Sequence, residues 1–161
     1  MRKERIVPHP MADDIPELGE VLDFMRLLWA VDHGLHSTSK RMIRSIGISG
    51  PQRLVIRIVG RAPDISAGAL AKVLHIHPST LTGVLRRLES RELIRRTADP
   101  LDGRRALIRL TPRGEELDNH ESGSVEESIA GVLDHQPPES IVEAVKVLLA
   151  IAEELGVEEP L

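Results

Sequence analysis

The segment from Leu93 to Thr111, LIRRTADPLDGRRALIRLT, constrains the fold of this chain more than any other. Its two ends, Leu93 to Thr97 and Ala106 to Leu110, are short runs that carry Ile, Leu and Thr. The stretch between them holds Asp99-Pro100 and Asp102-Gly103, which are turn-forming pairs. The segment therefore predicts a β-hairpin with a long, exposed tip.

This hairpin carries a high density of positive charge. Five arginines lie on its strands and tip: Arg95, Arg96, Arg104, Arg105 and Arg109. Almost nothing apolar lies near the tip, so the hairpin contributes little to a core. A ribbon of this kind is well suited to contact a polyanion.

The charge of the whole chain is segregated along its length. The net charge is -4, but residues 65–113 hold ten Lys and Arg against four Asp and Glu, a net of +6. Residues 114–161 hold one Lys against thirteen acidic residues, a net of -12. We therefore expect the middle segment to meet an anion and the C-terminal segment to have a different role.

Composition narrows the class of protein further. The chain has 161 residues and no cysteine, which excludes disulfides and thiolate metal sites. With one Phe, one Trp and no Tyr, its core must be aliphatic. No apolar run approaches the roughly 18 residues that span a bilayer, and the basic N-terminus lacks the apolar part of a secretory signal. We expect a cytoplasmic protein without a membrane partner.

Three helices are expected before residue 78. Residues 1–15, with two prolines and no apolar period, are expected to form a flexible arm. An apolar stripe from Leu18 to Leu35 predicts a first helix within residues 16–49. Pro51 is expected to open a second helix with Leu54, Val55, Ile58 and Val59 inward, and Ser66 to cap a short third one.

A fourth helix over residues 78–91 has two distinct faces. Leu81, Val84, Leu85 and Leu88 have the spacing of a buried face. On or beside the opposite face lie Ser79, Thr80, Thr82, Arg86 and Arg87. Short hydroxyl side chains can approach base edges or phosphates, and arginines can reach the DNA backbone or guanine. An ordinary amphipathic helix with a solvated basic face would look similar when taken alone.

The C-terminal segment is expected to form two more helices. Thr111 and Pro112 can start the fifth, which has a weak point at Ser122-Gly123-Ser124. The last helix follows Pro137-Pro138 and has a wide apolar face that needs a partner. It could fold back on its own subunit. We favour a homodimer built from residues 16–49 and 112–161 of two subunits, because a winged domain of about fifty residues cannot cover both terminal helices.

The run from Asp102 to Thr111, DGRRALIRLT, fits the pattern D-x-R-x-x-x-[IL]-x-L-T at every fixed position. On these residues, and with the helix before them, the chain resembles the MarR (multiple antibiotic resistance regulator) family. The resemblance implies a mainly α (α+β) fold of the winged helix-turn-helix type. Along the chain, four helices are followed by two strands and then by two more helices. The implied parts are a DNA-binding domain at 50–111, with recognition helix 78–91 and wing 93–111, and dimerisation helices on either side.

The resemblance also implies a function. Members of the family are dimeric, sequence-specific DNA-binding regulators, commonly ligand-responsive repressors, and a two-fold dimer prefers a pseudo-palindromic operator. By position in the motif, Arg104 would enter the minor groove and Asp102 would orient it. Arg105, which the motif does not fix, is expected to meet phosphate. Double-stranded DNA is the implied partner.

Two positions depart from the family pattern. Many members have Gly where the recognition helix turns into the wing, and Glu92 stands there in this chain. A left-handed residue other than Gly costs about 1 to 2 kcal/mol, so the helix is expected to end differently. His77 stands before Pro78, where Ser, Asp or Asn is the usual N-cap.

Proteins that resemble this family often bind small anionic aromatic molecules. The candidates here are on the first two helices: Trp29, His33, His36, Arg41 and Arg53. Each could equally be a helix-surface or dimer-interface group. His33 and His36 share a helix face that His120 could approach, but there is neither Cys nor H-E-x-x-H, so no metal or cofactor is expected.

Two other functions are compatible with parts of the sequence. The winged domain could serve as a protein-interaction module whose basic hairpin meets an acidic partner without specific DNA binding. An enzyme is the third alternative, but no G-x-S-x-G, phosphate-binding glycine loop or reactive cysteine is present. We therefore expect a regulator and no catalytic residues.

Overall fold

The computed structural model describes residues 18–103, 105–120 and 123–156. The chain divides into an N-terminal unit, Met1–Ser37, and a C-terminal unit, Thr38–Leu161. The expected arm at residues 1–15 and the expected helix start at Pro16 lie outside the described residues. In the described part, the first helix begins at Glu20 and ends at Ser45, so it belongs to both units.

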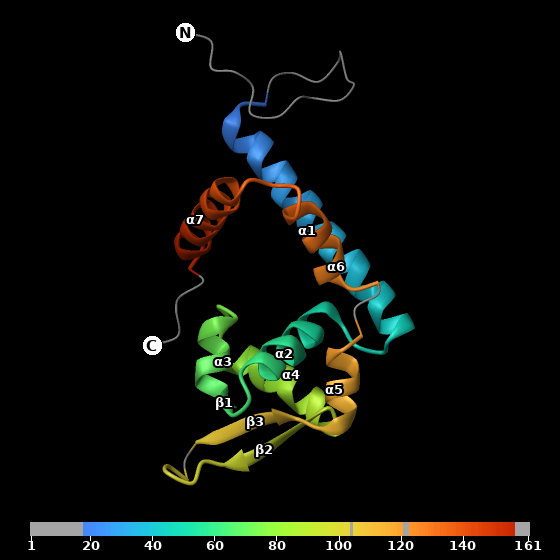
Figure 1. Cartoon of the computed structure of the whole chain (residues 1–161). Coiled ribbons are helices and arrows are strands. Elements are labelled where there is room, and N and C mark those ends of the chain that lie inside the picture. The colour runs from blue at the N-terminus through green and yellow to red at the C-terminus, as the bar shows by residue number, and fades with distance from the viewer. Residues whose placement is uncertain (1–17, 104, 121–122, 157–161) are drawn as a thin grey trace. The chain divides into compact units, whose positions relative to one another are not determined.

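Seven helices and three strands occur within the described residues (Figure 1). The helices are α1 (Glu20–Ser45), α2 (Gly50–Arg61), α3 (Ala67–Val73), α4 (Pro78–Ser90), α5 (Pro112–Asp118), α6 (Val125–Leu133) and α7 (Pro138–Glu154). The strands are β1 (Ile65–Ser66), β2 (Ile94–Ala98) and β3 (Ala106–Leu110). The expected fold class, mainly helical with a small antiparallel sheet, is confirmed.

Side-chain caps fix where most of these helices begin. Ser49 accepts a hydrogen bond from the Gln52 amide, and the Gln52 side chain accepts one from the Ser49 amide, which is a capping box. Ser66 caps α3 and Thr111 caps α5, as the sequence predicts. Since each cap pairs an otherwise unbonded amide of the first turn, these short polar residues set the helix boundaries.

The sheet has the strand order β1-β3-β2, with both pairs antiparallel. Ile94 faces Leu110 and Ala98 faces Ala106, which confirms the predicted hairpin. The two-residue strand β1, in which Ile65 pairs with Ile108, was not expected from the sequence. It is too short for a period-two pattern and forms only because β3 offers it a free edge.

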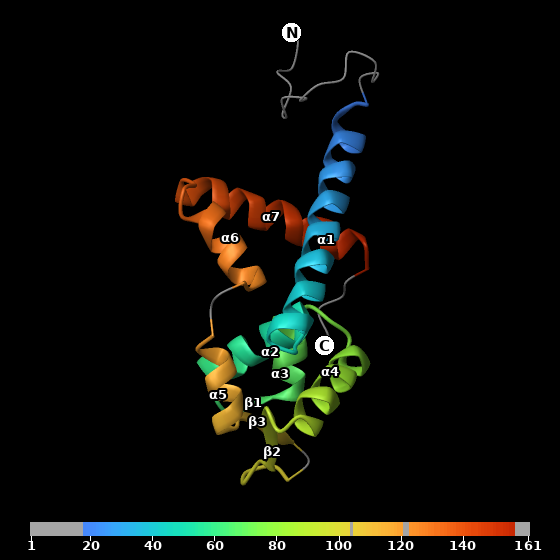
Figure 2. The same ribbon diagram turned by 90° about the vertical axis from the view of Figure 1, so that its right-hand side faces the viewer.

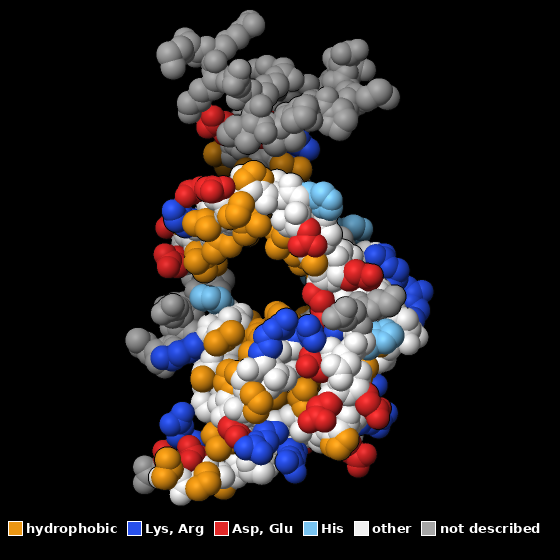
Figure 3. Space-filling view, in the orientation of Figure 1, with side chains coloured by type: hydrophobic (Ala, Val, Ile, Leu, Met, Phe, Trp, Pro, Cys, Tyr) orange, Lys and Arg blue, Asp and Glu red, His pale blue; other side chains and the backbone are white. Residues whose placement is uncertain are grey.

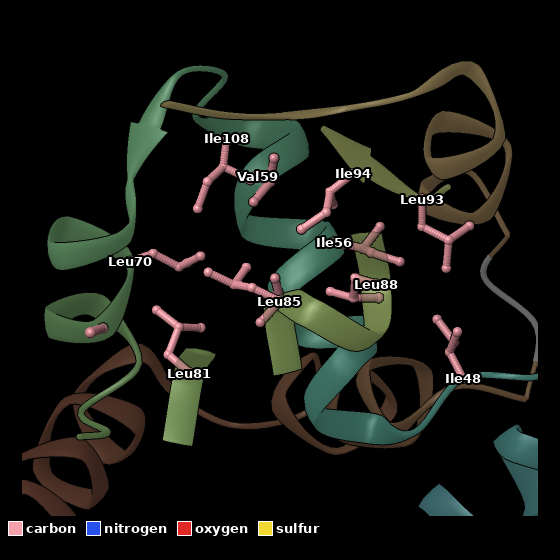
Figure 4. Close-up of a cluster of buried hydrophobic side chains, with 12 residues drawn as sticks. Ile48, Ile56, Val59, Leu70, Leu81, Leu85, Leu88, Leu93, Ile94 and Ile108 are labelled. Atoms are coloured by element: carbon pink, nitrogen blue, oxygen red, sulfur yellow. The ribbon is translucent and has the colours of Figure 1, made fainter. Parts of the chain in front are cut away.

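An aliphatic core holds helices α2, α3 and α4 against the sheet. Its members include Ile56, Leu70, Leu81, Leu85 and Ile108, all at most 1% exposed (Figure 4). The buried side of α2 differs from the expectation, because Ile56 is buried whereas Leu54 is 52% exposed. We call α2, α3, α4, α5 and the sheet the winged lobe.

The C-terminal segment contains three helices where two were expected. The predicted fifth helix is broken: α5 ends at Asp118, and α6 begins at Val125 with the buried Ser124 as its N-cap. Gly123 has a φ of 72°, a left-handed value that interrupts a helix. The sequence therefore placed the weak point correctly but underestimated its effect.

Candidate nucleic-acid interface

Helix α4 presents one buried face and one exposed face, as the sequence predicts. Leu81, Leu85 and Leu88 belong to the core. The exposed residues include all five expected contact residues of the helix: Ser79, Thr80, Thr82, Arg86 and Arg87. Within the described residues, neither the Arg86 nor the Arg87 guanidinium has a hydrogen-bond or ion-pair partner. Both charges are therefore available to an external anion.

The start of α4 is capped by an imidazole. His77 has an extended backbone, with φ -63° and ψ 140°, and its Nδ1 accepts a hydrogen bond from the Ser79 amide at 3.2 Å. The same Nδ1 lies 2.7 Å from the Ser79 hydroxyl oxygen. His77 thus caps the helix in place of the usual Ser, Asp or Asn.

The end of α4 turns left-handed without a glycine. Glu92 has a φ of 57°, and the Leu93 amide donates to the Leu88 carbonyl at 3.0 Å. The Thr111 hydroxyl also donates to the Glu92 carbonyl, and the Thr111 amide to the Leu93 carbonyl. The expectation of a different helix end was wrong, because these bonds hold a glutamate in the conformation usual for glycine.

The β2–β3 hairpin projects from the helices of the winged lobe (Figure 1 and Figure 2). Its tip is closed by the Asp99 amide, which donates to the Arg105 carbonyl at 2.9 Å, and by the Arg105 amide, which donates to the Asp102 carbonyl at 2.9 Å. Asp102 and Arg105 are exposed there. Arg104, the expected minor-groove residue, lies outside the described residues.

The described arginines of the hairpin are not equivalent. Arg96 forms an ion pair with Glu89 of α4 at 2.9 Å, and Arg109 donates two hydrogen bonds to the carboxylate of Asp64. Arg105 donates a long bond of 3.4 Å to the Ser66 hydroxyl. In Figure 3, Lys and Arg side chains are correspondingly interspersed with acidic ones over the lower part of the molecule.

These ion pairs were not predicted from the sequence, from which every arginine of the hairpin was expected to be available to an anion. Asp64 has a left-handed φ of 68° just before β1. Its pKa is lowered from the ordinary 3.8, chiefly by the hydrogen bond from Arg109, although burial acts in the opposite direction. The pKa of Arg109 is raised by the same bond. Asp64 and Glu89 thus hold the hairpin against the rest of the winged lobe. Within the described structure, Arg95 has no hydrogen-bond partner.

The expected effector residues fall into two groups. Trp29, His33 and His36 are exposed on α1 in the N-terminal unit, and Trp29 is 63% exposed. The His36 Nδ1 lies 2.9 Å from the Asp32 carbonyl oxygen. Arg41, in the C-terminal unit, is exposed and donates to the Thr38 hydroxyl at 2.8 Å.

Arg53 differs from the other effector candidates, because it is only 1% exposed. Its guanidinium donates to Glu126 of α6 at 2.7 Å and to the carbonyls of Leu117 and Asp118 at the end of α5. Arg57 joins the same cluster through the Asp118 carboxylate at 2.9 Å. Arg53 therefore holds α2, α5 and α6 together.

Together, α3, α4 and the hairpin define a winged helix-turn-helix protein. The family model described as "MarR family" matches residues 48–106. The transcriptional regulator HosA of Escherichia coli O157:H7 is 31% identical over 105 residues, 63% of this chain and 78% of that protein. Over 70 residues, HosA of Escherichia coli O111:H- is 37% identical, and the match spans about half (52%) of its length. The chain belongs to the MarR family of transcriptional regulators.

Two further comparisons agree with this assignment. The HTH-type transcriptional repressor Mb2911 of Mycobacterium bovis is 29% identical over 123 residues, 76% of this chain and 84% of that protein. The fold is that of Sco3205, a MarR family transcriptional regulator from Streptomyces coelicolor solved in complex with DNA. That structure has a TM-score of 0.70 and 23% identity, and the match covers 89% of this chain and 93% of the other. None of the helices in the described ranges has the length and apolar character needed to cross a bilayer.

Proposed function

We propose that this chain is a cytoplasmic, homodimeric regulator that binds DNA in a sequence-specific manner. The observation that carries the proposal is the exposed face of α4, where three hydroxyl side chains and two unpaired arginines lie together. A helix with its side chains is about 10 to 12 Å across, which matches a major groove about 12 Å wide. The names of the relatives and the DNA in the Sco3205 crystal support the same function.

Each part of the site has a distinct role in this proposal. Ser79, Thr80 and Thr82 approach base edges from the first turns of α4, while Arg86 and Arg87 reach guanine or the backbone. Arg104 enters the minor groove and Asp102 orients it, as in the family motif. Arg105 neutralises phosphate, whereas Arg96 and Arg109 mainly hold the hairpin in place through Glu89 and Asp64.

The dimer is supported by apolar surface on the terminal helices. Exposed positions include Val132 on α6 and Val145 and Leu148 on α7, which are 60%, 49% and 51% exposed. Further large apolar side chains are exposed on α1, among them Val21 and Trp29. Apolar surface on this scale indicates a protein partner. A second copy is favoured, because a two-fold dimer would present two α4 helices to successive major grooves.

The regulator is proposed to act as a repressor whose affinity for DNA falls when a small anionic aromatic effector binds. The name of the Mycobacterium relative supports repression. In the N-terminal unit, the exposed Trp29, His33 and His36 of α1 offer an aromatic surface and hydrogen-bonding groups for such a molecule.

Fluorescence anisotropy tests the DNA-binding proposal directly. The probe is a labelled duplex from the region upstream of the protein's own gene, titrated with the full chain at several salt concentrations. We expect log affinity to fall with log salt with a slope of about -0.9 for each phosphate contacted. Arg86→Ala should weaken binding by about 1 to 3 kcal/mol, and Arg104→Ala by a similar amount.

A matched control separates these contacts from general electrostatics. Lys146 lies on α7 and pairs with Glu143 at 2.7 Å, so Lys146→Ala removes one positive charge from a helix assigned to the dimer. Its affinity for DNA should match that of the wild type. Equal losses in Arg86→Ala and Lys146→Ala would contradict the site, and binding without any preference over random duplexes would favour the protein-interaction module.

A further inference from the structure

Ser79 and His77 form the hydrogen-bonded start of α4, and this arrangement limits what Ser79 can recognise. We propose that His77 fixes the Ser79 hydroxyl as a hydrogen-bond acceptor, so that Ser79 recognises an exocyclic amino group in the major groove. This inference rests on the proposed DNA-binding function. It assigns His77 as a positioning residue that acts through Ser79, and it names the chemistry that Ser79 selects.

The hydrogen bonds of His77 determine which ring nitrogen carries its proton. The backbone amide of Ser79 lies 3.2 Å from Nδ1 of His77. A backbone N–H can only donate, so Nδ1 must accept and can carry no proton. The capped helix therefore requires the neutral tautomer of His77 with its proton on Nε2.

This tautomer of His77 determines the direction of the hydrogen bond from the Ser79 hydroxyl. Ser79 Oγ lies 2.7 Å from the same Nδ1. Since Nδ1 has no proton, the hydroxyl must donate its single proton to His77. Only the lone pairs of Oγ then remain for a molecule outside the protein.

The base edges of DNA differ in the hydrogen-bond donors that they offer to such a serine. In the major groove, guanine offers the acceptors N7 and O6 and thymine offers O4, whereas donors come only from the amino groups of adenine N6 and cytosine N4. A serine that can only accept cannot bond guanine, thymine or a phosphate oxygen. Adenine and cytosine therefore share the chemistry that Ser79 selects.

Thr80 provides an internal comparison on the same helix turn. It is exposed, and its hydroxyl has no hydrogen-bond partner within the described part of the chain. It can donate or accept, so no selection for an amino group is expected of it. The contrast arises because His77 meets Ser79 and does not meet Thr80.

The test begins with sequences selected from random duplexes by the full-length wild type at about pH 8, where imidazoles are ordinarily neutral. Ser79→Ala identifies the base pair that Ser79 contacts, because the preference there is lost. We expect adenine or cytosine at that position. Replacing adenine by purine, which lacks the N6 amino group, or cytosine by 2-pyrimidinone, which lacks N4, distinguishes the two sources. The matching replacement should weaken wild-type binding roughly 5- to 150-fold.

Variants of His77 separate positioning from folding. His77→Ala removes the acceptor, so the preference at that one base pair should relax while preferences elsewhere in the site remain. His77→Asn keeps a capping oxygen that can accept from the Ser79 amide and hydroxyl, and it should restore the preference. Thr80→Val should leave this base pair unaffected. Thermal melting of each variant, followed by circular dichroism, verifies that it is folded.

The outcomes are distinguishable. A selected guanine or thymine edge at the Ser79 position, or an unchanged preference in His77→Ala, overturns the inference while the proposed function stands. A wild-type protein that enriches no sequence overturns the proposed function, and this inference with it.

Discussion

Gly83 lies at the centre of the exposed face of α4, where stability and DNA binding should respond to one substitution in opposite directions. A Cβ added at Gly83 would meet nothing within 4 Å in the described structure. Helix α4 therefore has no internal need for glycine at this position. We propose that the missing side chain lets the DNA approach the helix backbone between Ser79 and Arg86.

The expected change in stability follows from helix propensity, and the expected change in DNA affinity follows from the position of Gly83 on the exposed face. Replacing a glycine in a helix interior by alanine stabilises the helix by about 0.5 to 1 kcal/mol. For a chain of this size, 1 kcal/mol raises Tm by about 2 to 4 °C. The added methyl group would occupy space that the bases or sugars need. We expect the loss of about one base contact, or roughly 1 to 3 kcal/mol of binding free energy.

The assay measures both quantities on the same preparations of wild type and Gly83→Ala. Thermal unfolding gives the change in Tm, and anisotropy with a selected duplex gives the change in Kd. Gly131→Ala is the matched control, because Gly131 lies on α6 and its added Cβ also meets nothing within 4 Å. It should raise Tm without weakening DNA binding. A Gly83→Ala protein that binds DNA as tightly as the wild type would refute the reasoning.

Three further predictions concern the stability of the winged lobe. Glu92→Gly should stabilise the protein by about 0.5 to 1 kcal/mol. The substitution relieves about 1 to 2 kcal/mol of strain in the left-handed backbone, but glycine also raises the entropy of the unfolded chain. An unchanged or lower Tm would argue against strain at this position. Arg53→Met should lower the free energy of unfolding, measured in urea, by about 1 to 3 kcal/mol, because the carbonyls of Leu117 and Asp118 lose their buried partner. An unchanged urea midpoint would mean that these hydrogen bonds contribute nothing to stability. Asp64→Asn should lower Tm slightly at pH 7, because the lowered pKa of Asp64 means that the pair with Arg109 stabilises the fold above pH 3.8. The difference in Tm between the variant and the wild type should disappear as the pH falls from 3.8 through the lowered pKa of Asp64, because the carboxylate is then protonated. A difference in Tm that stays constant at all pH values would contradict this prediction.

Local signals in the sequence predicted much of the fold correctly. Ser66 and Thr111 begin helices because a hydroxyl beside free backbone amides acts within three residues along the chain. The hairpin followed from two short strands around turn-forming pairs, and the buried face of α4 from the spacing of its leucines. These features depend on neighbours in sequence, so no tertiary information was needed.

Features that depend on distant residues were not predictable in the same way. An arginine on a helix is normally exposed. Arg53 is buried only because the C-terminal end of α5, with its free carbonyl groups, packs against it. The ion pairs of Arg96 and Arg109 with Glu89 and Asp64 join different elements of the lobe. The His77 cap was not predicted either, although it is local, since it depends on a side-chain rotamer that sequence does not specify.

The sequence enriched by this protein from random duplexes tests the central claim most directly. We predict a pseudo-palindrome whose half-sites have centres about 10 base pairs apart, because two copies of α4 would occupy successive major grooves. Recovery of a single asymmetric half-site would contradict the dimer. Recovery of no common sequence would contradict recognition of DNA by α4 and the wing altogether.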